Sequence, residues 1–204
     1  MNGRLFNFLA AGSAALFSIG SAYALPNIAL TGTANQSSID PGGGFEGVAS
    51  RGIDGNRDGD YVNGSVTHTD TGDPDPAPGL FEWWDVTLAQ QYSFAQIIVF
   101  NRTDCCIERI EPFRLSVFNG LTSVYSVDVP SFVADITGPS IAGMTFTLGG
   151  QTGDRVRVQL TRQDFLSLAE VEAYATPIPE PTTLGLWGIG VLGVMLARRL
   201  RSKA

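Results

Sequence analysis

The sequence predicts an all-β domain, a sandwich or jelly roll, between two targeting segments. Within residues 25–176, short apolar or alternating runs typical of strands recur between clusters of glycine and proline. No helical periodicity there continues beyond two turns. Several short strands separated by turns favour a sandwich. The expected strands are residues 81–88, 94–101, 113–118, 124–129, 144–148, 155–160 and 170–175.

The first 24 residues are typical of a secretory signal peptide. One basic residue, Arg4, precedes an apolar run from Leu5 to Ile19, and Ala22-Tyr23-Ala24 is the small-x-small pattern of a cleavage site. We therefore expect residues 1–24 to form a signal helix. Export would bring the mature domain into an oxidising compartment, where a disulfide can persist.

Residues 177–204 combine a Pro179-Glu180-Pro181 tripeptide, an uncharged stretch at 182–197 and a cluster of basic residues, in that order. As a helix, residues 182–197 would rise about 24 Å, short of a hydrocarbon core of about 30 Å, so length alone also fits a buried helix. The flanking prolines and basic cluster favour a transmembrane helix with its arginine end in the cytoplasm.

The order of these three parts resembles the PEP-CTERM sorting signal of Gram-negative bacteria. The resemblance implies transient anchoring in the inner membrane through residues 182–197 and processing by an exosortase-type membrane protease. It also implies a final location on the cell surface or in the extracellular matrix.

The charge of the domain argues against a nucleic-acid partner. Residues 25–197 contain 8 arginines and all 20 acidic residues, a net charge of 8 − 20 = −12. Phosphate backbones are bound by basic patches, which such a domain is poorly equipped to supply. An acidic domain is better suited to binding a metal ion.

Residues 54–60, Asp-Gly-Asn-Arg-Asp-Gly-Asp, place many oxygen donors on a chain that can wrap tightly. The spacing matches the opening of an EF-hand loop. However, the twelfth position is Ser65 where a bidentate glutamate is needed, and no helices are expected on either side. The stretch therefore favours a calcium loop closed by a distant carboxylate, with a solvated acidic turn as the alternative.

The only two cysteines, Cys105 and Cys106, are neighbours between Arg102 and Arg109. Arginine side chains are rigid forks of donors, which suit oxygen-rich ligands. Two adjacent cysteines could form a small ring that presents an apolar sulfur surface, or they could stay as reduced, buried thiols. The only histidine, His68, follows the candidate metal loop in a polar stretch, which favours a role in a site.

Six stretches occur in an order that resembles the F-type lectin (fucolectin) family: residues 27–30, 53–58, 67–69, 83–88, 101–109 and 169–172. The resemblance covers about residues 26–175 and implies a discoidin-like (F5/8 type C, galactose-binding-like) jelly roll. The family signature is a histidine, then Arg-x-Asp, then an arginine or lysine after four residues. This sequence matches it with His68, Arg102, Asp104 and Arg109.

The resemblance also implies a role for each of these residues. His68, Arg102 and Arg109 would hydrogen-bond α-L-fucose, and Asp104 would orient an arginine. A Cys105–Cys106 disulfide would pack against the sugar ring and its methyl group, and Tyr61 would touch the same apolar face. The implied partners are fucosylated glycans or exopolysaccharide. The implied cofactor is Ca²⁺, bound by the side chains of Asp54, Ser65 and Glu170 and the carbonyls of Arg51, Asn56, Ser65 and Ala169.

Two other classes of protein remain open. The segment 72–79 lengthens the interval between His68 and Arg102 and could cover the pocket, which would favour an adhesion or matrix protein that does not bind sugar. A glycoside hydrolase needs two carboxylates about 5–10 Å apart across a cleft, and only Glu82 and Asp85 suggest themselves. We expect a lectin without enzymatic activity.

Overall fold

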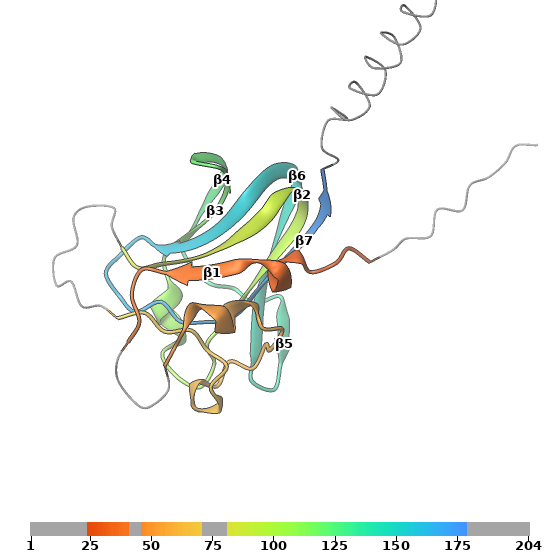
Figure 1. Ribbon diagram of the computed structural model, residues 1–204. Helices are drawn as coiled ribbons and strands as arrows, with labels where there is room; N and C mark the ends of the chain where they lie inside the picture. Colours follow the sequence, from red (N-terminus) through yellow and green to blue (C-terminus); the bar gives the residue numbers. More distant parts are fainter. Residues whose placement is uncertain (1–23, 41–45, 71–80, 179–204) are drawn as a thin grey trace, which may run out of the picture.

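The computed structural model describes residues 24–40, 46–70 and 81–178 and confirms the all-β prediction (Figure 1). Within these ranges the strands are β1 (Thr33–Gln36), β2 (Trp83–Asn101), β3 (Phe113–Asn119), β4 (Thr122–Val129), β5 (Ile136–Gly138), β6 (Ile141–Leu160) and β7 (Leu168–Pro177). Four 3₁₀ helices connect them: η1 (Ile28–Thr31), η2 (Ala49–Ile53), η3 (Tyr61–Asn63) and η4 (Ile107–Ile110).

The two long strands β2 and β6 bend and take part in both layers of the sandwich (Figure 1). The first half of β2 pairs with β1 and with the second half of β6, which continues to β3 and β4. The second half of β2 pairs with β7 and with the first half of β6, which also carries β5. All of these pairings are antiparallel.

The sequence-based strand bounds are correct in place but too short for β2 and β6. The two strands expected at 81–88 and 94–101 are one strand, whose pairing with β6 shifts register between Thr87 and Tyr92 and again between Phe94 and Gln96. The strands expected at 144–148 and 155–160 are likewise one strand, β6. Two short strands, β1 and β5, were not predicted.

A large apolar core fills the space between the layers, and a second, smaller cluster is formed by Val66, Ile98, Phe100 and Ala169. Along β6, Val156, Val158 and Leu160 point inward and are fully buried, as their alternation with polar residues predicts. Trp84 is 1% exposed, and its indole Nε1–H donates to the Ala49 carbonyl of η2 at 2.9 Å, which fastens the loop region below the sheet to the core. The loops that carry the candidate site therefore rest on a rigid base.

The targeting segments lie outside the described residues. Residues 1–23 of the expected signal peptide fall there, and so do the whole Pro179-Glu180-Pro181 motif and the whole expected transmembrane helix 182–197. The segment 72–79 also falls there. Among the described ranges, no helix is both long and apolar enough to cross a membrane.

Candidate functional site

The structure brings the histidine and both arginines of the signature together through two aromatic rings. Arg102 lies over the ring of Tyr61, with its Cζ 4.6 Å from the centroid, and the Tyr61 ring is 5.3 Å from that of His68. On the other side, the His68 ring is 5.2 Å from Phe165, and Arg109 lies over Phe165 at 4.8 Å. We call these five residues the stacked cluster.

Arg102 is held in one orientation by Asp104. Its Nε and Nη2 donate to the two carboxylate oxygens of Asp104 at 2.6 and 2.8 Å, a bidentate pair, and the residue is 8% exposed. Arg102 in turn holds the pKa of the Asp104 carboxyl below its ordinary value. The remaining guanidinium donors are therefore fixed in space before any ligand arrives.

His68 is buried in the middle of the stacked cluster, with 4% of its surface exposed. Its Nδ1 lies 2.8 Å from the Thr69 carbonyl and 3.5 Å from a carboxylate oxygen of Asp40. Burial lowers the pKa of the ring below 6.5, so the neutral form dominates at neutral pH. Since the Thr69 carbonyl can only accept, Nδ1 carries the proton in that form, and Nε2 is left as an acceptor.

Arg109 is more open than Arg102 and is oriented by residues that the sequence analysis missed. Its Nε is 3.8 Å from Asp164, and the guanidinium rests on Phe165. Asp164 also pairs with Arg162. Phe165 and Asp164 belong to the loop between β6 and β7, which has no motif that would mark it as part of a site.

The loop that follows β2 places the two cysteines beside Arg102. Asn101 donates its side-chain N–H to the Ile107 carbonyl at 2.9 Å, and the Thr103 N–H donates to the Gly59 carbonyl at 2.8 Å. The sulfur atoms of Cys105 and Cys106 are bonded to each other, and both residues are half-buried. An apolar sulfur surface thus lies next to the arginine donors in the same loop.

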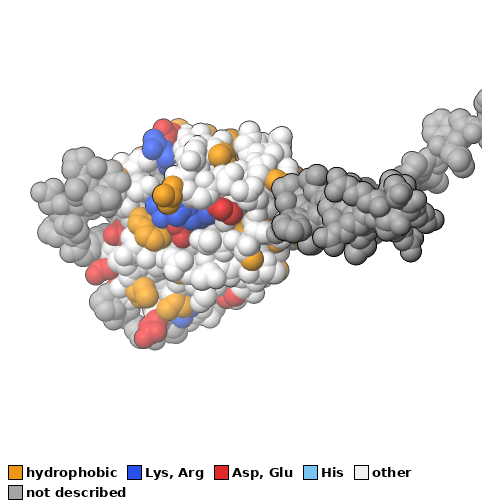
Figure 2. All heavy atoms as spheres, turned by 45° about the horizontal axis from the view of Figure 1, so that its top comes forward, with side chains coloured by type: hydrophobic (Ala, Val, Ile, Leu, Met, Phe, Trp, Pro, Cys, Tyr) orange, Lys and Arg blue, Asp and Glu red, His pale blue; other side chains and the backbone are white. Residues whose placement is uncertain are grey.

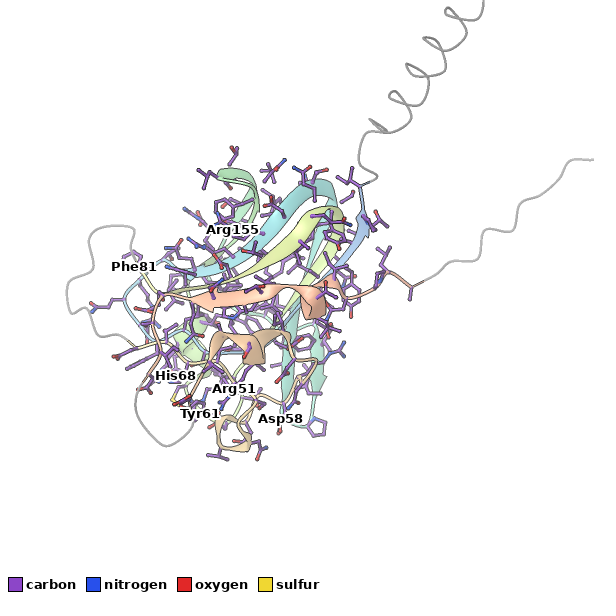
Figure 3. The ribbon with its side chains drawn as sticks, in the orientation of Figure 1. Arg51, Asp58, Tyr61, His68, Phe81 and Arg155 are labelled. Atoms are coloured by element: carbon purple, nitrogen blue, oxygen red, sulfur yellow. A yellow bond between two sulfur atoms is a disulfide. The ribbon has the colours of Figure 1, made fainter. Side chains whose placement is uncertain are left out.

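The candidate metal loop is built from a series of Asx turns. The carboxylate or amide oxygen of Asp54, Asn56, Asp58 and Asp60 each accepts the backbone N–H two residues later, at 2.8, 3.1, 3.0 and 3.2 Å. This pattern explains the alternation of oxygen-bearing residues without requiring a metal ion. Figure 3 shows Asp58 and Arg51 on the same lower side of the domain as Tyr61 and His68.

An ion pair fastens this loop to β7. Arg57 donates to both carboxylate oxygens of Glu172 at 2.6 and 2.9 Å and lies over the Phe100 ring at 4.9 Å. Glu172 is 4% exposed and also accepts from the Tyr174 hydroxyl at 2.8 Å. No sequence pattern indicated this pair.

One feature of the loop does suit a cation. Glu170 on β7 is fully buried; its Oε1 accepts the Gly55 N–H at 3.2 Å, while its Oε2 has no hydrogen-bond partner. Burial, together with the negative charges of Asp54 and Glu172, raises the pKa of Glu170 to about 8. A buried carboxylate oxygen without a partner is costly, and a bound cation would supply one.

The other expected calcium ligands gather around the same loop. Asp54 directly follows η2, Arg51 lies on η2, and the buried Ala169 precedes Glu170 on β7. The Ser65 hydroxyl donates to the Asp58 carbonyl. Among the described residues, no group of three or more His, Cys, Asp or Glu side chains is arranged for a metal. The expected set does not need one, because most of its oxygens come from carbonyls and a hydroxyl.

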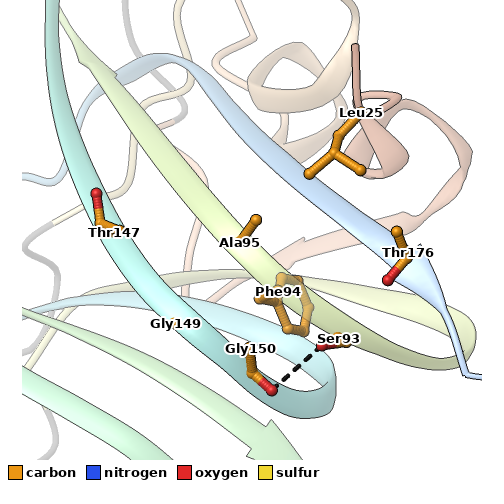
Figure 4. Close-up of a pocket in the computed structure, with 8 residues that line it drawn as sticks. All are labelled: Leu25, Ser93, Phe94, Ala95, Thr147, Gly149, Gly150 and Thr176. Carbon is orange, nitrogen blue, oxygen red and sulfur yellow. Dashed lines mark hydrogen bonds between the residues drawn. The ribbon is translucent and has the colours of Figure 1, made fainter. Parts of the chain in front are cut away.

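The two acids considered for hydrolysis are engaged elsewhere. Glu82 accepts from the hydroxyls of Ser37 and Ser38, and Asp85 pairs with Arg157 on β6 at 2.6 Å. A cavity of about 310 Å³ lies beside the points where the described chain begins and ends (Figure 4). None of the sugar-site or metal-site residues expected from the sequence lines it. Its walls are Leu25, Ser93, Phe94, Ala95, Thr147, Gly149, Gly150 and Thr176.

Two family models match the sequence. Residues 51–158 match the NedA-like, galactose-binding domain, and residues 177–201 match the PEP-CTERM protein-sorting motif. The predicted discoidin-like fold and the predicted sorting motif are therefore confirmed.

Relatives and solved structures agree with these matches. The chain is 34% identical to Fucolectin-1 of Anguilla japonica over 178 residues, 84% of this chain and 93% of the relative. A fucose binding module of Streptococcus pneumoniae superposes with a TM-score of 0.62 at 33% identity, covering 74% of this chain and 99% of the module. The lectin domain of Lectinolysin, solved with Lewis B antigen, gives 0.61 at 29% identity over 74% and 97%.

Proposed function

Because the chain belongs to the F-type lectin (fucolectin) family and carries a PEP-CTERM sorting motif, we propose that it is an exported lectin that binds fucosylated glycans. The observation that carries the proposal is the stacked cluster. It collects three signature side chains, His68, Arg102 and Arg109, from loops far apart in the sequence, and holds them with two aromatic rings.

The chemistry of the cluster suits a deoxysugar. Arg102 and Arg109 offer donors to hydroxyl and ring oxygens, and Nε2 of neutral His68 accepts from a hydroxyl. The bonded Cys105 and Cys106 supply an apolar surface for the ring and methyl group. A few oriented polar groups beside an apolar surface are typical of small-molecule sites. The tight Asp104 pair means that little of the binding energy is lost in ordering Arg102.

Calcium is the second part of the proposal. Asp54, Ser65 and Glu170 would hold the ion, with carbonyls of Arg51, Asn56, Ser65 and Ala169 completing its shell. The partnerless Oε2 of Glu170 supports this assignment. When bound, the ion would link the loop after η2 to β7 and so tie the N-terminal part of the domain to its last strand. Its role would be structural.

The arrangement of the chain ends fits a tethered lectin. The described chain begins and ends on one side of the domain, whereas Tyr61 and His68 lie in the loops at the lower end (Figures 1 and 3). A domain anchored through residues 182–197 would therefore present its sugar site away from the anchor. We propose export, transient anchoring in the inner membrane, cleavage by an exosortase-type protease and final display at the cell surface or in the matrix.

A glycan-array screen of the exported protein, with calcium and with a chelator, tests the proposed function. We expect selective binding of fucosylated glycans that weakens when calcium is removed. Incubating the bound fucosides with the protein and measuring released fucose separates binding from hydrolysis. Released sugar would favour the hydrolase, and an array with no bound glycan would favour the adhesion protein.

A further inference from the structure

The outer face of the five-stranded part of the sheet carries a continuous row of exposed or half-buried side chains. The row crosses all five strands in register: Thr33 on β1 pairs with Thr87 on β2, then Arg155 on β6, Phe118 on β3 and Ser123 on β4. Figure 2 looks toward this side and shows arginine side chains next to hydrophobic ones at its centre. In Figure 3, Arg155 lies above the sheet, away from His68 and Tyr61.

The two arginines of β6 on this face differ in how they are paired. Arg157 is satisfied, because it donates twice to Asp85, at 2.6 and 3.2 Å, and lies over the Trp83 ring at 4.1 Å. Arg155 is held over the Phe118 ring at 4.5 Å, but its Nε is buried without a hydrogen-bond partner. Its only hydrogen bond to a described residue is from Nη2 to the Gly120 carbonyl at 3.5 Å.

Arg155 also lacks a counter-charge. No carboxylate of the described residues lies within ion-pair distance of it, although the domain is strongly acidic and most of its arginines are paired. The buried Nε faces the protein, so a ligand would be bound by the two terminal nitrogens: Nη2 makes only the long bond to Gly120, and Nη1 has no hydrogen bond to a described residue. A planar guanidinium fixed over an aromatic ring in this way can bind a carboxylate through two parallel hydrogen bonds.

We propose that this outer face is a second glycan-binding surface, which takes a polysaccharide bearing carboxylate groups, such as a uronic acid polymer. Arg155 would bind a carboxylate. The exposed hydroxyls of Thr33, Thr87 and Ser123 would bond to sugar hydroxyls. Four gaps between adjacent strands, each about 4.8 Å, make the row about 19 Å wide, enough for several sugar rings. The ligand differs from fucose in charge, and the surface shares no residue with the stacked cluster.

A sugar polymer fits this face better than an acidic peptide does. Peptides commonly join a sheet by pairing with an exposed edge strand. The open edges of this sheet are β1 and β4, whereas Arg155 lies on the central strand β6, so a peptide paired with either edge would lie beside the face and away from Arg155. The net charge of the domain repels polyanions in general. Screening over about 8 Å at physiological ionic strength limits that repulsion, so the local field of Arg155 decides binding.

The test measures binding of the exported protein to polygalacturonate and, as a neutral match, to the same polymer with its carboxyl groups methyl-esterified. Arg155→Gln removes the guanidinium group that is proposed to bind the carboxylate. Arg114→Gln removes the same charge from the same face, at an exposed residue already paired with Asp128. We expect the wild type and Arg114→Gln to bind polygalacturonate equally, and Arg155→Gln to bind at least about tenfold more weakly. The esterified polymer should not bind.

Five results would overturn the proposal: no binding by the wild type, equal losses in the two variants, equal binding of the esterified polymer, displacement by free L-fucose, or equal binding of poly-L-glutamate. The last would show that the face recognises carboxylates on any polymer. Fucose affinity is measured on the same samples. Because Arg155 is remote from the stacked cluster, a failure here leaves the fucose result unchanged, and a failure to bind fucose leaves this test valid.

Discussion

Replacing Glu170 by glutamine should remove a pH dependence of stability that the structure imposes on the calcium-free protein. The pKa of Glu170 is raised from 4.5 to about 8, first by burial. The folded state therefore keeps this proton after the unfolded state has lost it. The contribution of the protonated Glu170 side chain to the free energy of unfolding is fully present below pH 4.5 and is lost as the pH rises through about 8.

The size of the effect follows from the two pKa values. The interval from 4.5 to about 8 is about 3.5 pH units, and each unit corresponds to about 1.36 kcal/mol, which gives a total loss of about 5 kcal/mol once the pH is well above 8. About 3.5 kcal/mol of this loss falls between pH 5 and pH 8. Calcium would counter this loss by binding the carboxylate, adding about 2.7 kcal/mol at one hundred times its dissociation constant. A glutamine side chain at this position cannot ionise, so the Glu170→Gln protein should lose both effects.

The assay is urea unfolding of the exported protein at pH 5 and pH 8, with chelator and with saturating calcium. Asp60→Asn is the control, because Asp60 lies in the same loop and is not an expected ligand. Its carboxylate accepts the Val62 N–H at 3.2 Å, and the substitution leaves untouched its backbone carbonyl, which accepts from the Ser65 hydroxyl. We expect Asp60→Asn to retain both the pH dependence and the calcium response. An undiminished calcium response in Glu170→Gln would refute the proposed site.

Three further predictions concern the sugar site. Because burial lowers the pKa of His68 below 6.5, fucose affinity measured from pH 8 to pH 5 should stay constant down to pH 6.5 and fall only below it. A loss of affinity with its midpoint above pH 6.5 would contradict the conclusion that the His68 ring is neutral at neutral pH. Intact-mass analysis of the exported protein after alkylation should find no reactive thiol at Cys105 or Cys106, and two added alkyl groups would refute the disulfide. Phe165→Ala removes the ring that lies between His68 and Arg109 and contacts both, so fucose affinity should fall about tenfold. Phe165→Leu restores the apolar volume without an aromatic face, so it should recover only part of the lost affinity. Unchanged affinity in Phe165→Ala would show that the ring does not position these two side chains.

The fold could be predicted in class and approximate strand position because β6 and its neighbours alternate clearly. The second half of β6 is indicated by the alternation of Val156, Val158 and Leu160 with polar residues. The continuity of β2 could not be predicted, because Gln90 and Gln91 look like a turn in sequence and stay in the strand only through a register shift against β6. β1, with the sequence Thr-Ala-Asn-Gln, has no apolar alternation and exists because it pairs with the buried part of β2.

The candidate site could be located from the sequence where a compact motif marks its residues. Arg102, Asp104 and Arg109 are close in sequence, and their spacing identifies them. Phe165 and Asp40 contact His68 only through the fold, and no local pattern in their loops indicates a ligand. The same holds for the Arg57–Glu172 pair, whose partners are 115 residues apart. Contacts between single side chains that are far apart in the sequence could therefore not be predicted.

The central claim is that the stacked cluster binds fucose, and calorimetric titration of methyl α-L-fucoside into the exported protein tests it most directly. The wild type should bind in the presence of calcium. Arg109→Ala should weaken binding by roughly tenfold to a hundredfold or more, because hydrogen bonds involving a charged group contribute about 1.5–3 kcal/mol. Arg114→Ala, which alters an arginine on the outer face, should leave the affinity unchanged. No binding by the wild type, or equal affinities for the wild type and Arg109→Ala, would contradict the account.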